Sequence, residues 1–262
     1  MCLWRGMILL MRVAALYDIH GNLPALRAVL ADVAREGIET VVIGGDVAAG
    51  PLPRETIEQV MALGPRARFV RGNADREVVD AYDQGRLSSE AESGPAERAA
   101  AFAAARISHN QRDFLADFRT TVVLDVDGLG PTVFCHGSPR SDTEIITTTT
   151  RDERLSEILS AVAEPVVVGG HTHRQFDRRL GGHRFINAGS VGSPYEGRVG
   201  AFWALLGPDI ELRRTVYDVA DAAEQLSATE FPDIDEMLRE SLTDPVDPDE
   251  VAAVFEELAT TS

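Results

Sequence analysis

The sequence predicts an α/β fold, with a largely parallel, helix-covered sheet in the first half and more antiparallel pairing in the second. Within the first 75 residues, short apolar segments alternate with helical patterns, and fully apolar strands are typical of sheets buried on both faces. After residue 175 the pattern changes to strands and tight turns, and Gly181-Gly182 is a strong hairpin signal. The 262 residues, 44% of them hydrophobic, are enough to bury a substantial core.

The first elements show how each segment is assigned. Val13 to Tyr17 is an unbroken apolar run, which predicts a buried strand. Leu23 to Arg35 carries apolar residues at helical spacing, which predicts an amphipathic helix. The same criteria predict further strands at Thr40–Ile43, Arg68–Val70, Thr121–Val126, Thr132–Cys135, Pro165–Val168, Gln175–Leu180, His183–Asn187, Ala201–Leu206 and Glu211–Val216, and helices at Thr56–Leu63, within 80–118 and at Asp152–Val162.

The negative charge is concentrated at the C-terminal end. The net charge is −17, and residues 218–262 hold 14 of the 42 acidic residues but only one arginine. Asp247-Pro248-Asp249-Glu250 predicts a capped helix start, and Val251, Val254, Phe255 and Leu258 would form its apolar stripe. We therefore expect an acidic helical tail, packed on the preceding domain or on a second subunit in a homo-oligomer.

Composition excludes several classes of protein. All 25 basic residues are arginines, so no P-loop lysine, Schiff-base lysine or lysine base is available. The acidic balance argues against nonspecific binding to nucleic acid or to anionic membranes. The two cysteines, Cys2 and Cys135, favour a cytoplasmic protein without a structural disulfide. Residues 1–12 are expected to be an N-terminal extension rather than a signal peptide, because their apolar stretch is too short.

Five short motifs lie where predicted strands end: Asp18-Ile19-His20-Gly21-Asn22, Gly45-Asp46, Gly72-Asn73-Ala74-Asp75, His136-Gly137 and Gly170-His171-Thr172-His173. Ligands of open α/β folds bind at the carboxyl ends of strands. The motifs pool seven metal donors: Asp18, His20, Asp46, Asn73, His136, His171 and His173. Seven mixed oxygen and nitrogen donors exceed one four-coordinate ion but suit two divalent ions that share a carboxylate. His171 and His173 flank a turn and could serve different ions.

These motifs, in this order, resemble those of the calcineurin-like metallophosphoesterase superfamily, and Asn187-Ala188-Gly189-Ser190-Val191-Gly192 is similar to its small bacterial and archaeal phosphodiesterase branch. The resemblance implies a four-layer α/β–β/α sandwich of two mixed sheets over residues 13–217. It implies that Asp18, His20 and His173 hold one metal, that Asn73, His136 and His171 hold the second, and that Asp46 bridges both. Asp46, Asn73 and His136 would then be the catalytic set.

The resemblance also implies the reaction: hydrolysis of a small phosphate ester, most naturally a diester, by a metal-bridging hydroxide. The mixed imidazole and carboxylate donors suit manganese, with iron, nickel, cobalt or zinc as alternatives. Two carboxylates leave two divalent ions with net positive charge, which attracts a phosphate. The noncatalytic alternative is an interaction scaffold on the same fold, like a eukaryotic retromer subunit whose site has decayed. All seven donors remain here, which favours the enzyme.

Two departures from the superfamily pattern affect the chemistry. Ala74 stands where many members have a histidine that assists the leaving group, so general-acid help worth about 10²–10⁴-fold is in question. Asp46 is not followed by the Asp-Arg pair of protein phosphatases, which disfavours that activity.

Substrate contacts are less well specified by the sequence. Arg76 and Arg140 could clamp a phosphate or pair with nearby acids. Asn22 could bind phosphate or cap the following helix, and Asn187 is expected to orient the site. Residues 80–118 are the expected lid or substrate wall.

Overall fold

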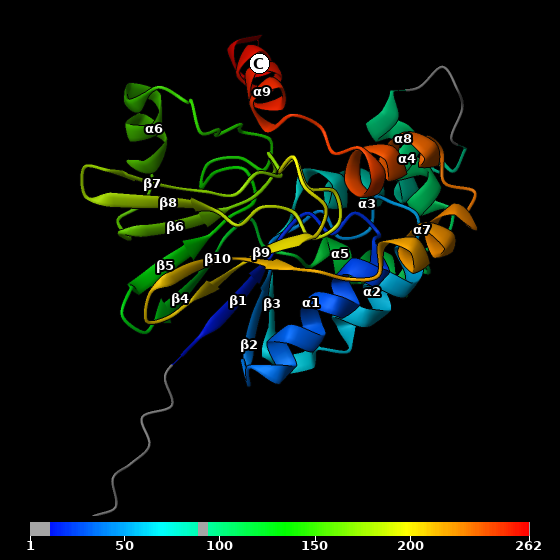
Figure 1. Cartoon of the computed structure of the whole chain (residues 1–262), viewed down its shortest axis with the longest axis horizontal. Helices are drawn as coiled ribbons and strands as arrows, with labels where there is room; N and C mark the ends of the chain where they lie inside the picture. The colour runs from blue at the N-terminus through cyan, green and yellow to red at the C-terminus, as the bar shows by residue number, and fades with distance from the viewer. Residues whose placement is uncertain (1–10, 89–93, 262) are drawn as a thin grey trace, which may run out of the picture.

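The computed structural model describes residues 11–88 and 94–261. Cys2 and most of the predicted N-terminal extension lie outside these residues, as does part of the segment 80–118. The described chain forms two five-stranded sheets that stack face to face, with helices on the outer sides, as Figure 1 shows. This arrangement confirms the predicted α/β sandwich.

The first sheet is mixed. Its order is β10-β9-β1-β2-β3, with β1 parallel to β2 and antiparallel to β9. The strands are β1 (Val13–Leu16), β2 (Thr40–Ile43), β3 (Ala67–Phe69), β9 (Ala201–Leu206) and β10 (Ile210–Thr215). Strand β9 thus joins a sheet whose first strand lies at the opposite end of the domain's sequence.

The second sheet is also mixed, with the order β4-β5-β6-β8-β7. Its strands are β4 (Val122–Val126), β5 (Gly130–Phe134), β6 (Val166–Gly169), β7 (Phe176–Leu180) and β8 (His183–Asn187). Strands β5, β6 and β8 run parallel, and the predicted Gly181-Gly182 turn joins the antiparallel pair β7 and β8.

Successive side chains of the central strands face opposite sides of the sheet, and this alternation builds the layers of the sandwich. Val13, Ala15 and Tyr17 of the first sheet face the second sheet and pack in a shared core with residues such as Phe134 and Ile186. The intervening Ala14 and Leu16 face the helices instead. These helices are α1 (Leu23–Arg35), α2 (Pro53–Met61), α3 (Asn73–Asp83), α4 (Pro95–Ala104) and α5 (His109–Ala116), while α6 (Asp152–Leu159) covers the outer face of the second sheet.

Helix α3 begins inside the motif that follows β3. Asn73 is the first residue of the helix, and the Asp75 side chain accepts a hydrogen bond from the backbone N–H of Gly72. An acidic residue at the third helical position satisfies a free N–H group of the first turn. The asparagine of the motif is therefore fixed by a helix start.

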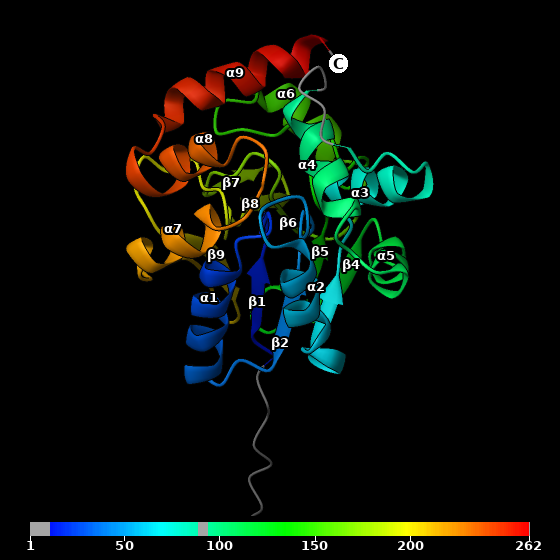
Figure 2. The ribbon, with the colours of Figure 1, turned by 90° about the vertical axis from the view of Figure 1, so that its right-hand side faces the viewer.

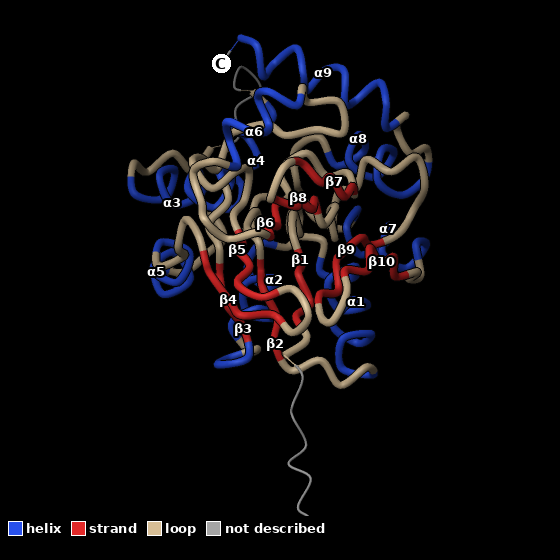
Figure 3. The backbone as a smooth tube through the Cα atoms, turned by 90° about the vertical axis from the view of Figure 1, so that its left-hand side faces the viewer, coloured by secondary structure: helices blue, strands red, loops and turns tan. Residues whose placement is uncertain are grey.

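The acidic tail folds into helices that lie against the sandwich: α7 (Val219–Ser227), α8 (Ile234–Leu238) with a π-helical turn at Arg239–Thr243, and α9 (Pro248–Thr261). Figures 2 and 3 show α9 across the end of the molecule toward which β1 runs. Its predicted apolar stripe is only partly right. Val251, Ala252 and Phe255 face the body, whereas the predicted Val254 and Leu258 are 57% and 49% exposed, because the helix docks one residue further round than predicted.

None of the described helices is both long and apolar enough to span a membrane.

Candidate metal centre

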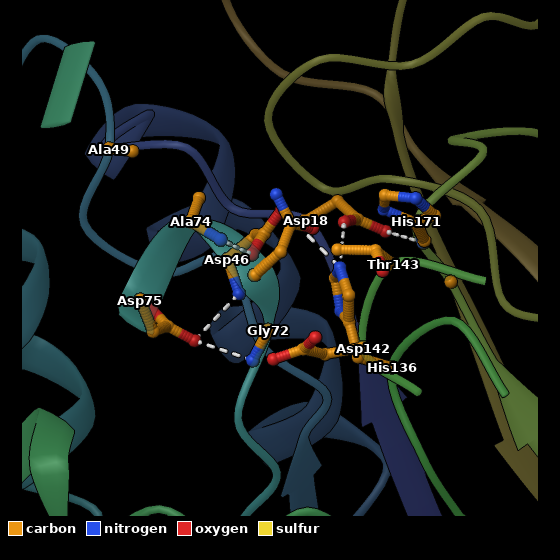
Figure 4. Close-up of polar contacts among 12 residues, drawn as sticks. Asp18, Asp46, Ala49, Gly72, Ala74, Asp75, His136, Asp142, Thr143 and His171 are labelled. Atoms are coloured by element: carbon orange, nitrogen blue, oxygen red, sulfur yellow. Dashed lines mark hydrogen bonds and ion pairs between the residues drawn. The ribbon is translucent and has the colours of Figure 1, made fainter. Parts of the chain in front are cut away.

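The seven predicted donors converge at one end of the sandwich, in segments that follow five strands. Figure 4 shows Asp18, Asp46, His136 and His171 turned toward a common point. Asp18 and His20 follow β1, Asp46 follows β2 and Asn73 opens α3 after β3; His136 follows β5, and His171 and His173 follow β6. Both sheets therefore contribute to the centre, because each sheet's parallel strands end at the same edge.

The first cluster consists of Asp18, His20 and His173, whose ligand atoms all lie within 4.8 Å of one another. The Nε2 atom of His173 is 3.4 Å from Asp18 Oδ1 and 3.1 Å from His20 Nε2. A cation bound between two nitrogens that face each other at this distance would account for the approach.

The second cluster consists of Asp46, His136 and His171, with ligand atoms again within 4.8 Å of one another. His136 Nε2 lies 3.3 Å from Asp46 Oδ2. The same Asp46 oxygen is 3.7 Å from His20 Nε2 of the first cluster, so Asp46 stands between the two clusters. His171 and His173 fall into different clusters, as their spacing around a turn suggests.

Backbone carbonyls orient the imidazoles. His20 Nδ1 is 3.1 Å from Ala49 O, His136 Nδ1 is 2.8 Å from Gly44 O, and His173 Nδ1 is 2.6 Å from Ser193 O. A carbonyl oxygen only accepts, so each Nδ1 carries the proton and each Nε2 presents its lone pair to the centre. This arrangement is common among metal-binding histidines.

Backbone N–H groups hold one oxygen of each aspartate in the same way. One oxygen of Asp18 accepts the His171 N–H at 2.9 Å, and one oxygen of Asp46 accepts the Ala74 N–H at 2.8 Å. Asp18 Oδ1, Asn73 Oδ1 and His136 Nε2 are buried but have no hydrogen-bond partner among the described residues. Buried polar atoms without a partner are costly, and one cation at each cluster would satisfy all three. The residues present therefore fit a pair of divalent metal ions.

The loops adopt strained backbone conformations at the ligands themselves. Only six described residues other than glycine have a left-handed φ, and five are predicted ligands: Asp18, His20, Asp46, His171 and His173. Such strain, about 1–3 kcal/mol per residue, is concentrated at functional sites. Gly72 shows the same tight fit, because a Cβ there would lie 2.1 Å from Asp46 Oδ1.

Electrostatics in the centre compensates the buried carboxylates with positive charge. Burial opposes ionisation of Asp18 and Asp46, but the surrounding histidines outweigh it and lower the pKa of both carboxyl groups. Burial would lower the pKa of His136, yet Asp46 and Asp18 raise it to about 10. For His171, burial and then His136 lower the pKa to about 4.

Asp75 is a structural member of the site to which the sequence pattern assigns no role, although it belongs to the Gly-Asn motif. It is fully buried and accepts the N–H groups of Asp46 and Val47 at 2.9 Å and of Gly72 at 3.0 Å. Figure 4 shows it joining the loop after β2 to the start of α3. Burial and the neighbouring Asp46 raise the pKa of Asp75 to about 7, against these three donors.

The three predicted substrate contacts have protein partners. Asn22 is fully buried, accepts the Ala25 N–H and donates to Gly192 O, so it caps α1. Arg140 pairs with Glu144 and Glu157. Arg76 binds both oxygens of Asp142, at 3.1 and 3.3 Å, and the same carboxylate lies 3.5 Å from Arg71.

Asn187 supports the loop that carries two histidines, as predicted. Its amide donates to Gly170 O at 2.7 Å and to Thr172 Oγ1 at 3.0 Å, on either side of His171. Two aromatic residues lie on the same side of the centre, and the sequence motifs assigned neither of them to it. Tyr195 stacks on His173 at 5.0 Å, and Phe255 of α9 lies 6.4 Å from His171.

The fold and the two clusters together define a class: a two-sheet α/β sandwich whose strand-end loops gather histidines and carboxylates for two metal ions. The family model described as the calcineurin-like phosphoesterase superfamily domain matches residues 11–206. The chain belongs to this superfamily.

Individual relatives agree with this assignment. A metallophosphoesterase crystal structure from Sphaerobacter thermophilus has a TM-score of 0.71 and 27% identity, over 90% of this chain and 100% of that one. A hypothetical protein from Pyrococcus horikoshii has a similar fold, with a TM-score of 0.74 and 21% identity over 90% and 99% of the two chains. An uncharacterized protein of Methanocaldococcus jannaschii is 25% identical over 84% of this chain and 94% of its own.

Proposed function

We propose that this protein is a dinuclear metal-dependent phosphodiesterase that acts on a small phosphorylated substrate. The observation that carries the proposal is the pair of donor clusters that meet at Asp46, with three buried ligand atoms left without partners. A noncatalytic scaffold has no need to retain every donor, nor to hold five of them in left-handed backbone conformations.

Asp18, His20 and His173 would hold one ion, His136, His171 and Asn73 the other, and Asp46 both. Two such ions supply a hydroxide nucleophile at neutral pH and neutralise the phosphoryl oxygens. The protein's own part is to fix the Nε2 atoms through the carbonyl contacts. We propose manganese as the native metal, to be checked by metal analysis of protein purified without chelators.

Ala74 bears on the leaving group. Its backbone N–H holds Asp46, but its methyl side chain transfers no proton, and no histidine other than the metal donors lies in the five motifs. Esters with good leaving groups should therefore be preferred, because they need no general acid. Equal kcat values on alkyl and aryl diesters would contradict this.

The test is turnover of bis(p-nitrophenyl) phosphate by the manganese-loaded protein, with p-nitrophenyl phosphate as the monoester comparison. We expect a higher kcat/KM for the diester. Full metal occupancy without turnover of either ester would favour the scaffold instead.

A further inference from the structure

A cavity of about 410 Å³ opens beside the first donor cluster. Its lining includes His20 and His173 of the first cluster, Pro95 and Ala99 of α4, and residues between 231 and 240 of the acidic tail, which packs against α4. The volume falls in the usual range of small-molecule sites. Helix α4 belongs to residues 80–118, the segment expected from the sequence to be a lid or substrate wall.

The cavity is continuous with the metal centre. The buried Asp18 Oδ1, which has no hydrogen-bond partner among the described residues, belongs to the same cluster of ligand atoms as His20 and His173. A phosphate held by this cluster would therefore place one of its ester substituents between α4 and the tail. The lining of the cavity then decides which substituents are accepted.

The lining is acidic and includes no arginine among the described residues. Asp233 is compensated by Arg98, at 3.0 Å, and Glu240 by Arg239, at 2.8 Å, with the Arg239 side chain half exposed. Glu236 has no ion-pair partner in the described part of the chain. With Asp233 and Glu240 paired and Glu236 unpaired among the described residues, the three carboxylates leave this wall of the cavity with a net negative charge. A substituent with its own phosphate would be repelled.

The same cavity offers aromatic and aliphatic surface. Phe231 is held edge-on against Phe102, with ring centroids 5.2 Å apart, and Tyr195 is fixed by its stacking on His173. Carboxylates combined with aromatic faces form the environment that attracts alkylammonium groups, whose methyl or methylene groups contact the rings while the charge faces the acids. Neutral aliphatic groups gain only the first of these two contacts.

We propose that this cavity selects phosphodiesters in which one ester substituent carries an ammonium group. The selection rests on the proposed function, since the metal centre must hold the phosphate. It goes beyond that function by naming the substrate class and by giving Glu236 and Glu240 the role of specificity determinants. The substrate as a whole is then close to neutral, with its anionic end at the metals and its cationic end at the tail.

The test compares two monoesters that differ in one atom. Phosphocholine and 3,3-dimethylbutyl phosphate have the same shape, but a quaternary nitrogen in the first is a carbon in the second. Binding of each to the manganese-loaded protein is measured by calorimetry. Kinetics are measured with the corresponding p-nitrophenyl diesters. We expect about tenfold tighter binding of phosphocholine. The double variant Glu236→Gln/Glu240→Gln should remove the preference, and Glu224→Gln, an exposed residue of α7, should keep it.

The outcomes separate the two proposals. Equal binding of the two monoesters would overturn the ammonium selection, while turnover of both diesters would leave the phosphodiesterase intact. A phosphocholine preference that the double variant abolishes would support the selection even if neither diester were hydrolysed, in which case the proposed activity fails. Vesicles of phosphatidylcholine form a separate arm: their hydrolysis would identify a lipid headgroup, and its absence a soluble ester, as the source of the ammonium group.

Discussion

Replacement of Asp46 by asparagine tests the shared carboxylate most directly. In the structure, Asp46 Oδ1 accepts the Ala74 N–H at 2.8 Å, and an asparagine carbonyl can keep this bond. Oδ2, which lies 3.3 Å from His136 Nε2 and 3.7 Å from His20 Nε2, would become an amide NH2 that points at both cation positions. The change removes one negative charge and adds a donor where acceptors are needed.

The expected magnitude follows from this geometry. Loss of one partner from a buried charge pair costs about 3–5 kcal/mol. Since about 1.4 kcal/mol is a factor of ten, metal affinity should fall by about 10²–10⁴-fold. The assay is metal content per chain after dialysis, together with kcat on bis(p-nitrophenyl) phosphate at saturating manganese, where we expect a loss of several orders of magnitude. Asp125→Asn, on the exposed side of β4, is the matched control. Two retained ions with near-normal kcat would refute the shared role of Asp46.

Three further predictions concern the rest of the site. Manganese loading at about pH 7.5 should release at least one proton, because the pKa of His136 is raised to about 10 and metal binding needs the neutral imidazole. Calorimetry in buffers of different ionisation enthalpy measures the number of protons released, and this number should fall to zero above about pH 10. Asp75→Asn should lower the free energy of unfolding by about 2–3 kcal/mol in urea titrations, because an amide cannot accept all three N–H groups; an unchanged midpoint would contradict this. Truncation before α9 should leave two ions bound, since every donor lies at or before His173, but it should lower Tm because Phe255 and its contacts are lost. Metal analysis measures the first effect and a thermal melt the second. Loss of the ions would place α9 in the centre itself.

The metal donors were predictable because each follows a strand that the sequence marks clearly. Apolar runs such as Val13 to Tyr17 predict buried strands, and parallel strands deliver the residues after them to one edge. An aspartate at one strand end is a common turn or cap residue, but imidazoles and carboxylates at several strand ends that meet at one end of the sandwich indicate metal binding. The pairing of β9 with β1 was not predictable, because it depends on a contact across the whole length of the domain.

Contacts that have no local sequence pattern were not predicted. Gly44, Ala49 and Ser193 orient three histidines through backbone carbonyls, and a carbonyl is present at every position of the chain. Tyr195 reaches His173 through a loop whose path no periodicity describes. The docking face of α9 was predicted one residue out of place, because a helix with several apolar positions can turn about its axis at little cost.

The acidic tail connects these observations to the charge of the whole chain. Part of its negative charge meets arginines of the body: Asp233 pairs with Arg98, Glu230 with Arg106, and Asp249 with Arg174. These pairs join the tail to the sandwich, so they place the tail beside the metal centre rather than leave it as a solvated extension. Glu236 and Glu240 then face the cavity that leads to His20 and His173. Under the proposed function, the cations would attract a phosphate, while a second anionic group on the same substrate would meet the tail. The proposed selection gives the uneven charge of this sequence a role in substrate choice at short range. Added salt should weaken the ammonium preference, because these carboxylates are partly exposed to solvent.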